Sequence, residues 1–203
     1  VDFLSLVLKY RDKNTNEGEL AAFITYAISY PHNFLALIDT YDTLVSGIWN
    51  FVYVALALHQ CGYKSKGIRL DSGDLAYLSI EVRKIFHNIS KIYQIDYFKD
   101  LLIIASNDIN EHVLHSLKVQ GNEIDVYGIG THLVTCKLQP ALGCVYKLVE
   151  IEDHPRVKIS QDHIKINLPG KKNIYRLYNR ENIAILDLII NEKYDLIPKK
   201  NEK

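Results

Sequence analysis

The stretch GIRLDSGD, residues 67–74, combines a short strand with the start of a helix, and this combination decides the fold class. Gly67 to Leu70 is predicted to be a buried strand, and Asp74 has the side chain of a helix N-cap. Apolar residues then recur at three- and four-residue spacing as far as Ile89, which predicts an amphipathic helix. A strand that leads directly into such a helix is the first half of a βαβ unit.

The same pattern recurs on the carboxyl side of this stretch. Residues 101–105 and 124–127 are predicted strands. The helix between them is expected to begin at an Asp108 cap, with Glu111 three residues on, and to end at Gly121. Strands that alternate with helices indicate a parallel sheet in an α/β domain.

The amino-terminal side fits the same arrangement. Residues 35–38 form a predicted strand between two helices. The first helix is capped by Asn16 and ended by Pro31, and the second covers the almost wholly apolar run from Trp49 to Leu58.

Beyond Pro140 the pattern changes, and an antiparallel β-rich appendage is expected there. The predicted strands of this part are residues 145–151, 156–159, 164–168 and 174–178. We therefore divide the chain into an α/β core (1–140), a β-rich segment that packs on it (141–190) and a polar tail (191–203).

Composition excludes several classes of protein. The 203 residues include 24 Lys and Arg and 24 Asp and Glu, so no broad positive field is available for a nucleic acid or an acidic membrane surface. The three cysteines, Cys61, Cys136 and Cys144, have no CxxC spacing and are expected to be reduced thiols. Because no stretch of about 18 apolar residues occurs, we expect a cytosolic protein. The absence of methionine and the start at Val1 favour an excised piece of a longer chain.

Polar residues follow the predicted strands at the points where ligands of parallel α/β folds gather. They are Asp39, Arg69 with Asp71, Ser106 with Asn107, and the run Gly128 to Thr131. Arg69 and Asp71 lie on one side of their strand by its period of two. Arg69 suits a substrate carboxylate or phosphate, and Asp71 suits a ribose hydroxyl, Mg²⁺ or a cationic ring. The alternative is a mutual salt bridge together with a helix cap, with no ligand.

The glycines Gly128 and Gly130, with Thr131, are candidates for a phosphate cradle made of backbone N–H groups and a hydroxyl. The alternative is a plain tight turn, and residue 133 is Leu, so the run is not a GxGxxG motif. His112 and His115 suit a solvated helix face better than a metal site, because no carboxylate or thiol completes a set. His132, beside the glycines, is a weaker candidate for contact with an anion.

Taken in order, five runs resemble the nicotinate phosphoribosyltransferase family: LIDTYD (37–42), GIRLDSGDL (67–75), IIASN (103–107), DVYGIGT (125–131) and QPALG (139–143) with VYKL (145–148). PGKK (169–172) with Arg176 extends the resemblance to about residue 178. The resemblance implies an irregular parallel α/β barrel of the type II phosphoribosyltransferase kind, with a β-rich appendage, in a homodimer. It also implies that nicotinate and Mg²⁺-bound phosphoribosyl pyrophosphate form nicotinate mononucleotide and pyrophosphate, with ATP as co-substrate, in NAD salvage.

By the same resemblance, Arg69 and Asp71 are the catalytic candidates, with Arg69 on the nicotinate side of the site. Asp39, Ser72, Asn107 and Lys172 are expected to bind substrate, with Lys147 weaker, and Gly128, Gly130 and Thr131 to hold the 5′-phosphate. No metal ligand is assigned. The family's phosphorylated histidine and ring-stacking aromatic residue have no counterpart in the sequence, because neither His32 nor His132 has the matching context. The alternatives are a nicotinamide phosphoribosyltransferase and a truncated, non-catalytic nucleotide-binding core.

Overall fold

A computed structural model describes residues 2–135, 145–160 and 163–194, and these form two compact units. Of the described residues, the first unit contains 2–135 with 159–160 and 163, and the second contains 145–158 with 164–194. No helix in the described part of the chain has the length and apolar character needed to cross a bilayer.

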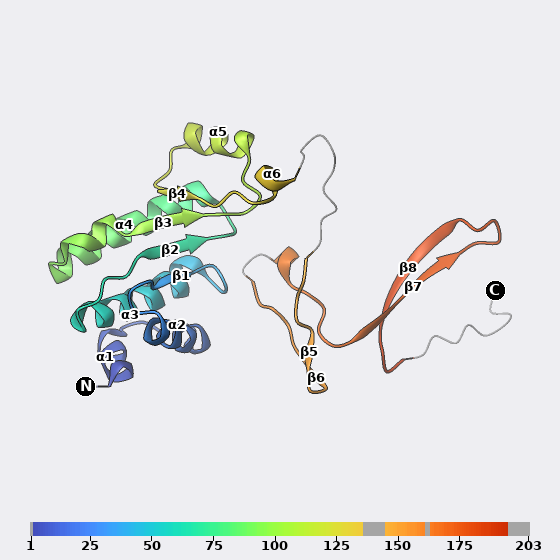
Figure 1. Ribbon diagram of the computed structural model, residues 1–203, viewed down its shortest axis with the longest axis horizontal. Coiled ribbons are helices and arrows are strands. Elements are labelled where there is room, and N and C mark those ends of the chain that lie inside the picture. Colours follow the sequence, from blue (N-terminus) through green and yellow to red (C-terminus); the bar gives the residue numbers. More distant parts are fainter. Residues whose placement is uncertain (1, 136–144, 161–162, 195–203) are drawn as a thin grey trace. The chain divides into compact units, whose positions relative to one another are not determined.

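The first unit is built on a parallel sheet whose four strands follow their order in the sequence, β1-β2-β3-β4. The strands are β1 (Leu35–Leu37), β2 (Gly67–Leu70), β3 (Leu102–Ala105) and β4 (Val126–Tyr127), and they lie side by side in Figure 1. The helices between them are α3 (Ile48–Gln60), α4 (Leu75–Tyr93) and α5 (Glu111–Gln120). The predicted α/β alternation and parallel sheet are confirmed. Among the described residues the sheet does not close on itself.

Side-chain caps explain where the main helices begin. Asn16 accepts a hydrogen bond from the Glu19 N–H at 2.9 Å and starts α2 (Glu17–Ser29), as predicted. Asp74 does the same for α4, because its Oδ1 accepts from the Tyr77 N–H at 3.0 Å.

The predicted cap of α5 was wrong. Asn110, not Asp108, caps this helix, and its Oδ1 accepts from the Val113 N–H at 3.1 Å. Asp108 has a φ of +49°, in the left-handed region, whereas an N-cap residue needs extended backbone. The chain therefore turns at Asp108 and enters the helix two residues later.

Shorter helices complete this unit. They are α1 (Phe3–Tyr10), the π-helix η1 (Thr43–Gly47), the 3-10 helix η2 (Asp96–Asp100) and the single turn α6 (Thr131–Val134). The last residue of η1, Gly47, has to be glycine because a Cβ there would lie 1.9 Å from the Ile38 carbonyl oxygen. The backbone of η1 consequently lies directly against the end of β1.

The hydrophobic core lies on one face of the sheet. Ile68, Leu70, Ile103 and Ala105 point to that face and are fully buried. Helix α4 packs on β2 and β3. The ring of Phe51 on α3 stacks on Phe34 at 5.4 Å between centroids and lies 5.9 Å from Phe86 of α4.

The opposite face of the sheet is apolar but only partly covered by the described residues. Leu102 is 37% exposed and Val126 41%, and Leu37 and Ile104 are half-buried. Arg69 points to the same face and is exposed. Parallel sheets are normally covered on both faces, so this face has the character of a surface that other parts of a protein cover.

The second unit is antiparallel. Its strands are β5 (Glu150–Ile151) with β6 (His154–Pro155) and β7 (Lys172–Tyr178) with β8 (Ala184–Asn191). In the second pair Arg176 stands opposite Asp187, and the two side chains form a bidentate ion pair of 2.7 and 2.8 Å.

The strand predictions for this part were only partly right. The predicted run 174–178 lies within β7, but β8 was missed. No strand forms among the described residues of 156–159 and 164–168, where the 3-10 helix η3 (His163–Lys165) occupies part of the second run. Only residues 150–151 of the run 145–151 pair as a strand, since β6 offers just two partners.

A buried polar cluster joins α2, η1 and α3. Glu19 is 4% exposed, and its Oε2 accepts from Ser46 Oγ at 2.8 Å and from Asn50 Nδ2 at 2.9 Å. Its Oε1 and Asn50 Oδ1 are buried and find no hydrogen-bond partner among the residues that the structure describes. Burial raises the pKa of Glu19, the two hydrogen bonds oppose that rise, and the charges of Asp39 and Asp42 add to it.

The aromatic stack predicts a large effect of truncating Phe51. We expect Phe51→Ala to lower the free energy of unfolding by about 3–5 kcal/mol, since a fully buried ring is replaced by a cavity. Denaturant titration measures the loss. Tyr77→Ala, at an exposed position on α4, is the control and should change stability by less than about 0.5 kcal/mol. Equal losses in the two variants would show that the ring stack is not the centre of the core.

The Glu19 cluster predicts a pH dependence of stability. A carboxyl whose folded-state pKa is raised contributes stability that is complete below its unfolded pKa, near 4.5, and is lost as pH rises through the folded pKa. Relative to Glu19→Gln, which cannot ionise, the protein should therefore lose stability as pH rises above 4.5. Urea titrations of both proteins from about pH 4 to about pH 8 measure the difference. A difference that stays constant or changes in the other direction would contradict this assignment.

Candidate active site

One network of side-chain hydrogen bonds joins the carboxyl ends of β1, β2 and β3. Asp39, two residues beyond β1, is 4% exposed, and its Oδ2 accepts from the Asp71 N–H at 3.1 Å and from Ser72 Oγ. Ser106, directly after β3, donates from Oγ to Asp71 Oδ1 at 2.6 Å. Asp71 is therefore held from two sides, its backbone by β1 and its carboxylate by β3.

Asp39 positions its neighbours through this network. Both hydrogen bonds that it accepts are charge-assisted, which makes them stronger than bonds between neutral groups. Its Oδ1 is buried and has no hydrogen-bond partner among the described residues. Ser72 is 3% exposed, and its hydroxyl hydrogen is already donated to Asp39. That Asp39 and Ser72 also bind substrate remains a prediction.

Arg69 lies in the middle of the sheet, on its partly covered face. Its backbone neighbours are Leu37 of β1 and Ile104 of β3. Its side chain is exposed and forms no ion pair with Asp71 or with any other residue described by the structure. The mutual salt bridge considered as the alternative is absent from this part of the chain, so the guanidinium is available to an anion.

The run after β4 differs in part from the predicted cradle. The Gly128 N–H donates to the Ala105 carbonyl at 2.7 Å and is not available to a phosphate. A Cβ on Gly128 would lie 3.3 Å from the Ser106 Cβ, so glycine here leaves room for that serine. The Gly130 carbonyl accepts from the N–H groups of Leu133 and Val134 and begins the turn α6.

Three further predicted residues have different surroundings. Asn107 is exposed, with a φ of +118°, immediately after Ser106. Lys172 lies in the second unit. Its Nζ donates to the carbonyl oxygens of Leu168 at 2.6 Å and Gly170 at 2.5 Å, so it stabilises the loop that precedes β7. Lys147 is half-buried in the same unit. Substrate contact by these residues remains a prediction.

The histidines and cysteines supply no metal site within the described residues. His112 and His115 are exposed on α5, and His132 is half-buried on α6. No group of three or more His, Cys, Asp and Glu side chains in residues 2–135, 145–160 and 163–194 is placed to hold a metal ion. Cys61 is a free, exposed thiol, and the other two cysteines lie outside the described residues.

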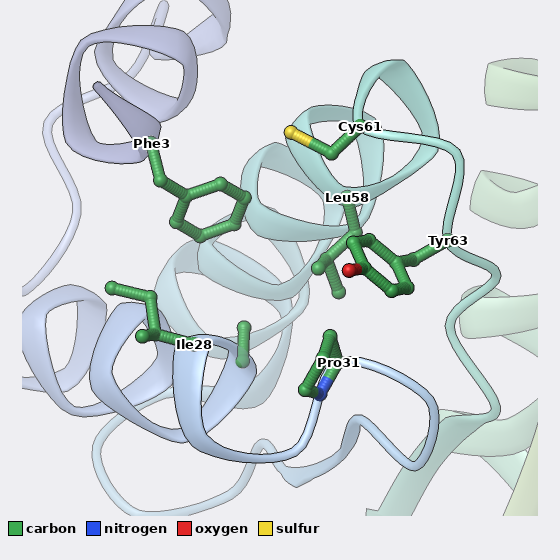
Figure 2. Close-up of a pocket in the computed structure, with 7 residues that line it drawn as sticks. Phe3, Ile28, Pro31, Leu58, Cys61 and Tyr63 are labelled. Atoms are coloured by element: carbon green, nitrogen blue, oxygen red, sulfur yellow. The ribbon is translucent and has the colours of Figure 1, made fainter. Parts of the chain in front are cut away.

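A small apolar pocket of about 170 Å³ lies among α1, α2 and the end of α3, and it contains none of the predicted site residues. Figure 2 shows the Phe3 ring, Ile28, Pro31, Leu58, Cys61 and Tyr63 around it. Its lining supplies few polar groups to orient a ligand, so it does not compete with the strand ends as an active site.

Sequence reasoning placed Ser106 at a strand end but gave it no role. The register supplies the missing signal: Leu70 pairs with Ala105, so the next residues of the two strands, Asp71 and Ser106, meet beyond the sheet. A strand pattern alone does not fix that register.

Comparison with known proteins relates almost the whole chain to one enzyme family. Nicotinate phosphoribosyltransferase of Dictyostelium discoideum is 55% identical over 195 residues, which are 94% of this chain and 33% of that protein. Nicotinate phosphoribosyltransferase 1 of Arabidopsis thaliana is 54% identical over 178 residues, 88% of this chain and 32% of the relative. The chain thus spans about a third of the length of these relatives. No family model matches it.

The fold leads to the same relationship. The crystal structure of human nicotinic acid phosphoribosyltransferase matches with a TM-score of 0.60 and 33% identity, over 97% of this chain and 38% of that one. The human sequence is 44% identical over 172 residues, which are 85% of this chain and 32% of that protein. On these sequence and structural similarities, the chain belongs to the nicotinate phosphoribosyltransferase family, of whose members it spans about a third.

Proposed function

We propose that the protein is a nicotinate phosphoribosyltransferase, which forms nicotinate mononucleotide and pyrophosphate from nicotinate and phosphoribosyl pyrophosphate. The observation that carries this proposal is the convergence of Asp39, Asp71 and Ser106 at the ends of adjacent strands, with Arg69 on the sheet beside them. Ligands of parallel α/β proteins bind at this edge. Relatives over 94% and 88% of the chain are named for this activity.

The reaction requires positioning and charge balance more than side-chain nucleophiles. The bond between C1 of the ribose and the pyrophosphate oxygen breaks, and pyrophosphate leaves with the electron pair. Positive charge develops on C1 and the ring oxygen, and the nitrogen of nicotinate forms the new bond to C1. Two anionic substrates therefore meet around a carbon that becomes cationic.

The described residues suit these needs. The Arg69 guanidinium pairs with the nicotinate carboxylate, because two parallel N–H donors match its two oxygens. Asp71 faces the phosphoribosyl group, whose hydroxyls donate to carboxylates. The N–H of Gly130 and the Thr131 hydroxyl bind the 5′-phosphate, whereas Gly128 contributes space for Ser106.

Mg²⁺ enters this proposal with phosphoribosyl pyrophosphate and supplies charge neutralisation for the leaving group. The donor set at the strand ends fits that arrangement: Mg²⁺ usually takes one or two protein carboxylates together with substrate phosphates and water. Asp71 is the carboxylate that would reach it. ATP as co-substrate is also part of the proposal and rests on the resemblance alone.

We further propose that the sheet is a segment of the irregular α/β barrel of type II phosphoribosyltransferases. Four strands in sequential order without a reversal support this, because a doubly wound sheet reverses its order. The partly covered apolar face also supports it, since a barrel turns such a face inward. A β-rich appendage over 141–190, a homodimer and a cytosolic location complete the proposal.

The decisive assay follows pyrophosphate release by the purified protein from phosphoribosyl pyrophosphate and Mg²⁺, with nicotinate or nicotinamide, and with or without ATP. We expect nicotinate to support release and nicotinamide to support much less. Arg69→Ala should lower kcat/KM for nicotinate by roughly 100-fold, since it removes a charged contact to that substrate. Arg180→Ala, at an exposed position outside the sheet, is the control and should leave kcat/KM unchanged.

Release that depends on nicotinamide instead would support the nicotinamide enzyme. No release with either base would leave a non-catalytic nucleotide-binding core as the better description. Normal activity of the Arg69 variant would remove Arg69 from the site while leaving the family activity in place.

A further inference from the structure

Ser106 makes a hydrogen bond that none of the predicted site roles uses. Its Oγ donates to Asp71 Oδ1 at 2.6 Å, and its N–H donates to the Leu70 carbonyl at 2.9 Å. The second bond continues the ladder between β2 and β3 by one residue. The backbone of Ser106 is therefore fixed against β2, the strand that leads to Asp71. This fixed backbone places the Ser106 hydroxyl beside the Asp71 carboxylate.

The chain leaves the sheet abruptly after Ser106. Asn107 and Asp108 have φ values of +118° and +49°, which residues other than glycine rarely adopt. Such a backbone conformation persists only where its surroundings impose it. The chain therefore turns away from the sheet directly after Ser106, the first residue beyond β3.

Gly128 confines Ser106 from the β4 side. A Cβ at Gly128 would lie 3.3 Å from the Ser106 Cβ, closer than most such contacts. The Gly128 N–H is bound to the Ala105 carbonyl at 2.7 Å, so β4 cannot move away from β3 without breaking that bond. Ser106 thus occupies a place that β4 leaves open by having no side chain there.

We propose that Ser106 is a positioning residue for substrate binding: it fixes the carboxylate of Asp71 in the orientation that receives the phosphoribosyl group of phosphoribosyl pyrophosphate. The proposal rests on the function proposed above. A hydroxyl that donates to one carboxylate oxygen restrains the rotation of the whole carboxylate group. Asp39 fixes the Asp71 backbone through its N–H, and Ser106 fixes the side chain.

The test measures binding of phosphoribosyl pyrophosphate with Mg²⁺ by calorimetry, which requires no turnover. Ser106→Ala should weaken binding by about tenfold or more, the usual effect of losing a hydrogen bond to a charged group. Ser106→Cys keeps the shape with a weak donor and should behave like the alanine variant, which shows that the hydroxyl and not the volume is needed. The unfolding midpoint should be similar in the unmutated protein and both variants, which separates positioning from a merely structural role.

A double-mutant cycle with Asp71→Asn tests whether Ser106 acts through Asp71. In the Asp71→Asn background the alanine variant should have little further effect, because the two residues form one unit. In assays of turnover the same variant should raise KM for phosphoribosyl pyrophosphate and leave KM for nicotinate within about twofold.

Additive effects in the cycle, or unchanged binding by Ser106→Ala, would overturn the inference. So would failure of the unmutated protein to bind phosphoribosyl pyrophosphate. Binding that depends on Ser106 without nicotinate-dependent release would uphold the inference and refute the proposed function, so the two failures are distinguishable.

Discussion

The buried carboxylate of Asp39 accepts hydrogen bonds from the Asp71 N–H and the Ser72 hydroxyl, and the order of the strand ends depends on these two bonds. These bonds join the segment that follows β1 to the loop that follows β2. Because the Asp39 side chain is buried, the loss of either donor would leave a buried acceptor without a partner, which is costly. The loop before the Asp74 cap is consequently held in one conformation, and that conformation presents Asp71 to Ser106.

The two faces of the sheet have different parts in this account. One face is covered by the hydrophobic core and supplies the rigidity, with α4 packed on β2 and β3 and Phe51 between Phe34 and Phe86. The other face carries Arg69 among partly covered apolar side chains. A rigid sheet is what lets residues from separate strands hold fixed distances from one another, since cores packed on regular elements deform little. The reaction proposed here depends on such distances more than on any reactive side chain.

Sequence reasoning succeeded where local chemistry decides the outcome and failed where distant residues do. The caps at Asn16 and Asp74, the alternation of strands and helices, and the position of Arg69 and Asp71 on one strand all follow from neighbours in the sequence. The role of Ser106 depends on the register of β2 and β3, and the loss of the Gly128 N–H depends on β3 and β4. Residues 184–191 were given no strand of their own, although most of them lie in the segment expected to be β-rich, and they form β8.

Hydrogen exchange at the Asp71 amide tests the Asp39 contact most directly. Asp39→Asn keeps the size of the side chain and removes the charge, so its bond to this amide should weaken. We predict that exchange at Asp71 becomes at least about tenfold faster in the variant, while the amides of Ile103 and Ser106, which are bonded to other acceptors, change little. Equal protection of the Asp71 amide in the two proteins would contradict the account, because the strand ends would then be held by something other than Asp39.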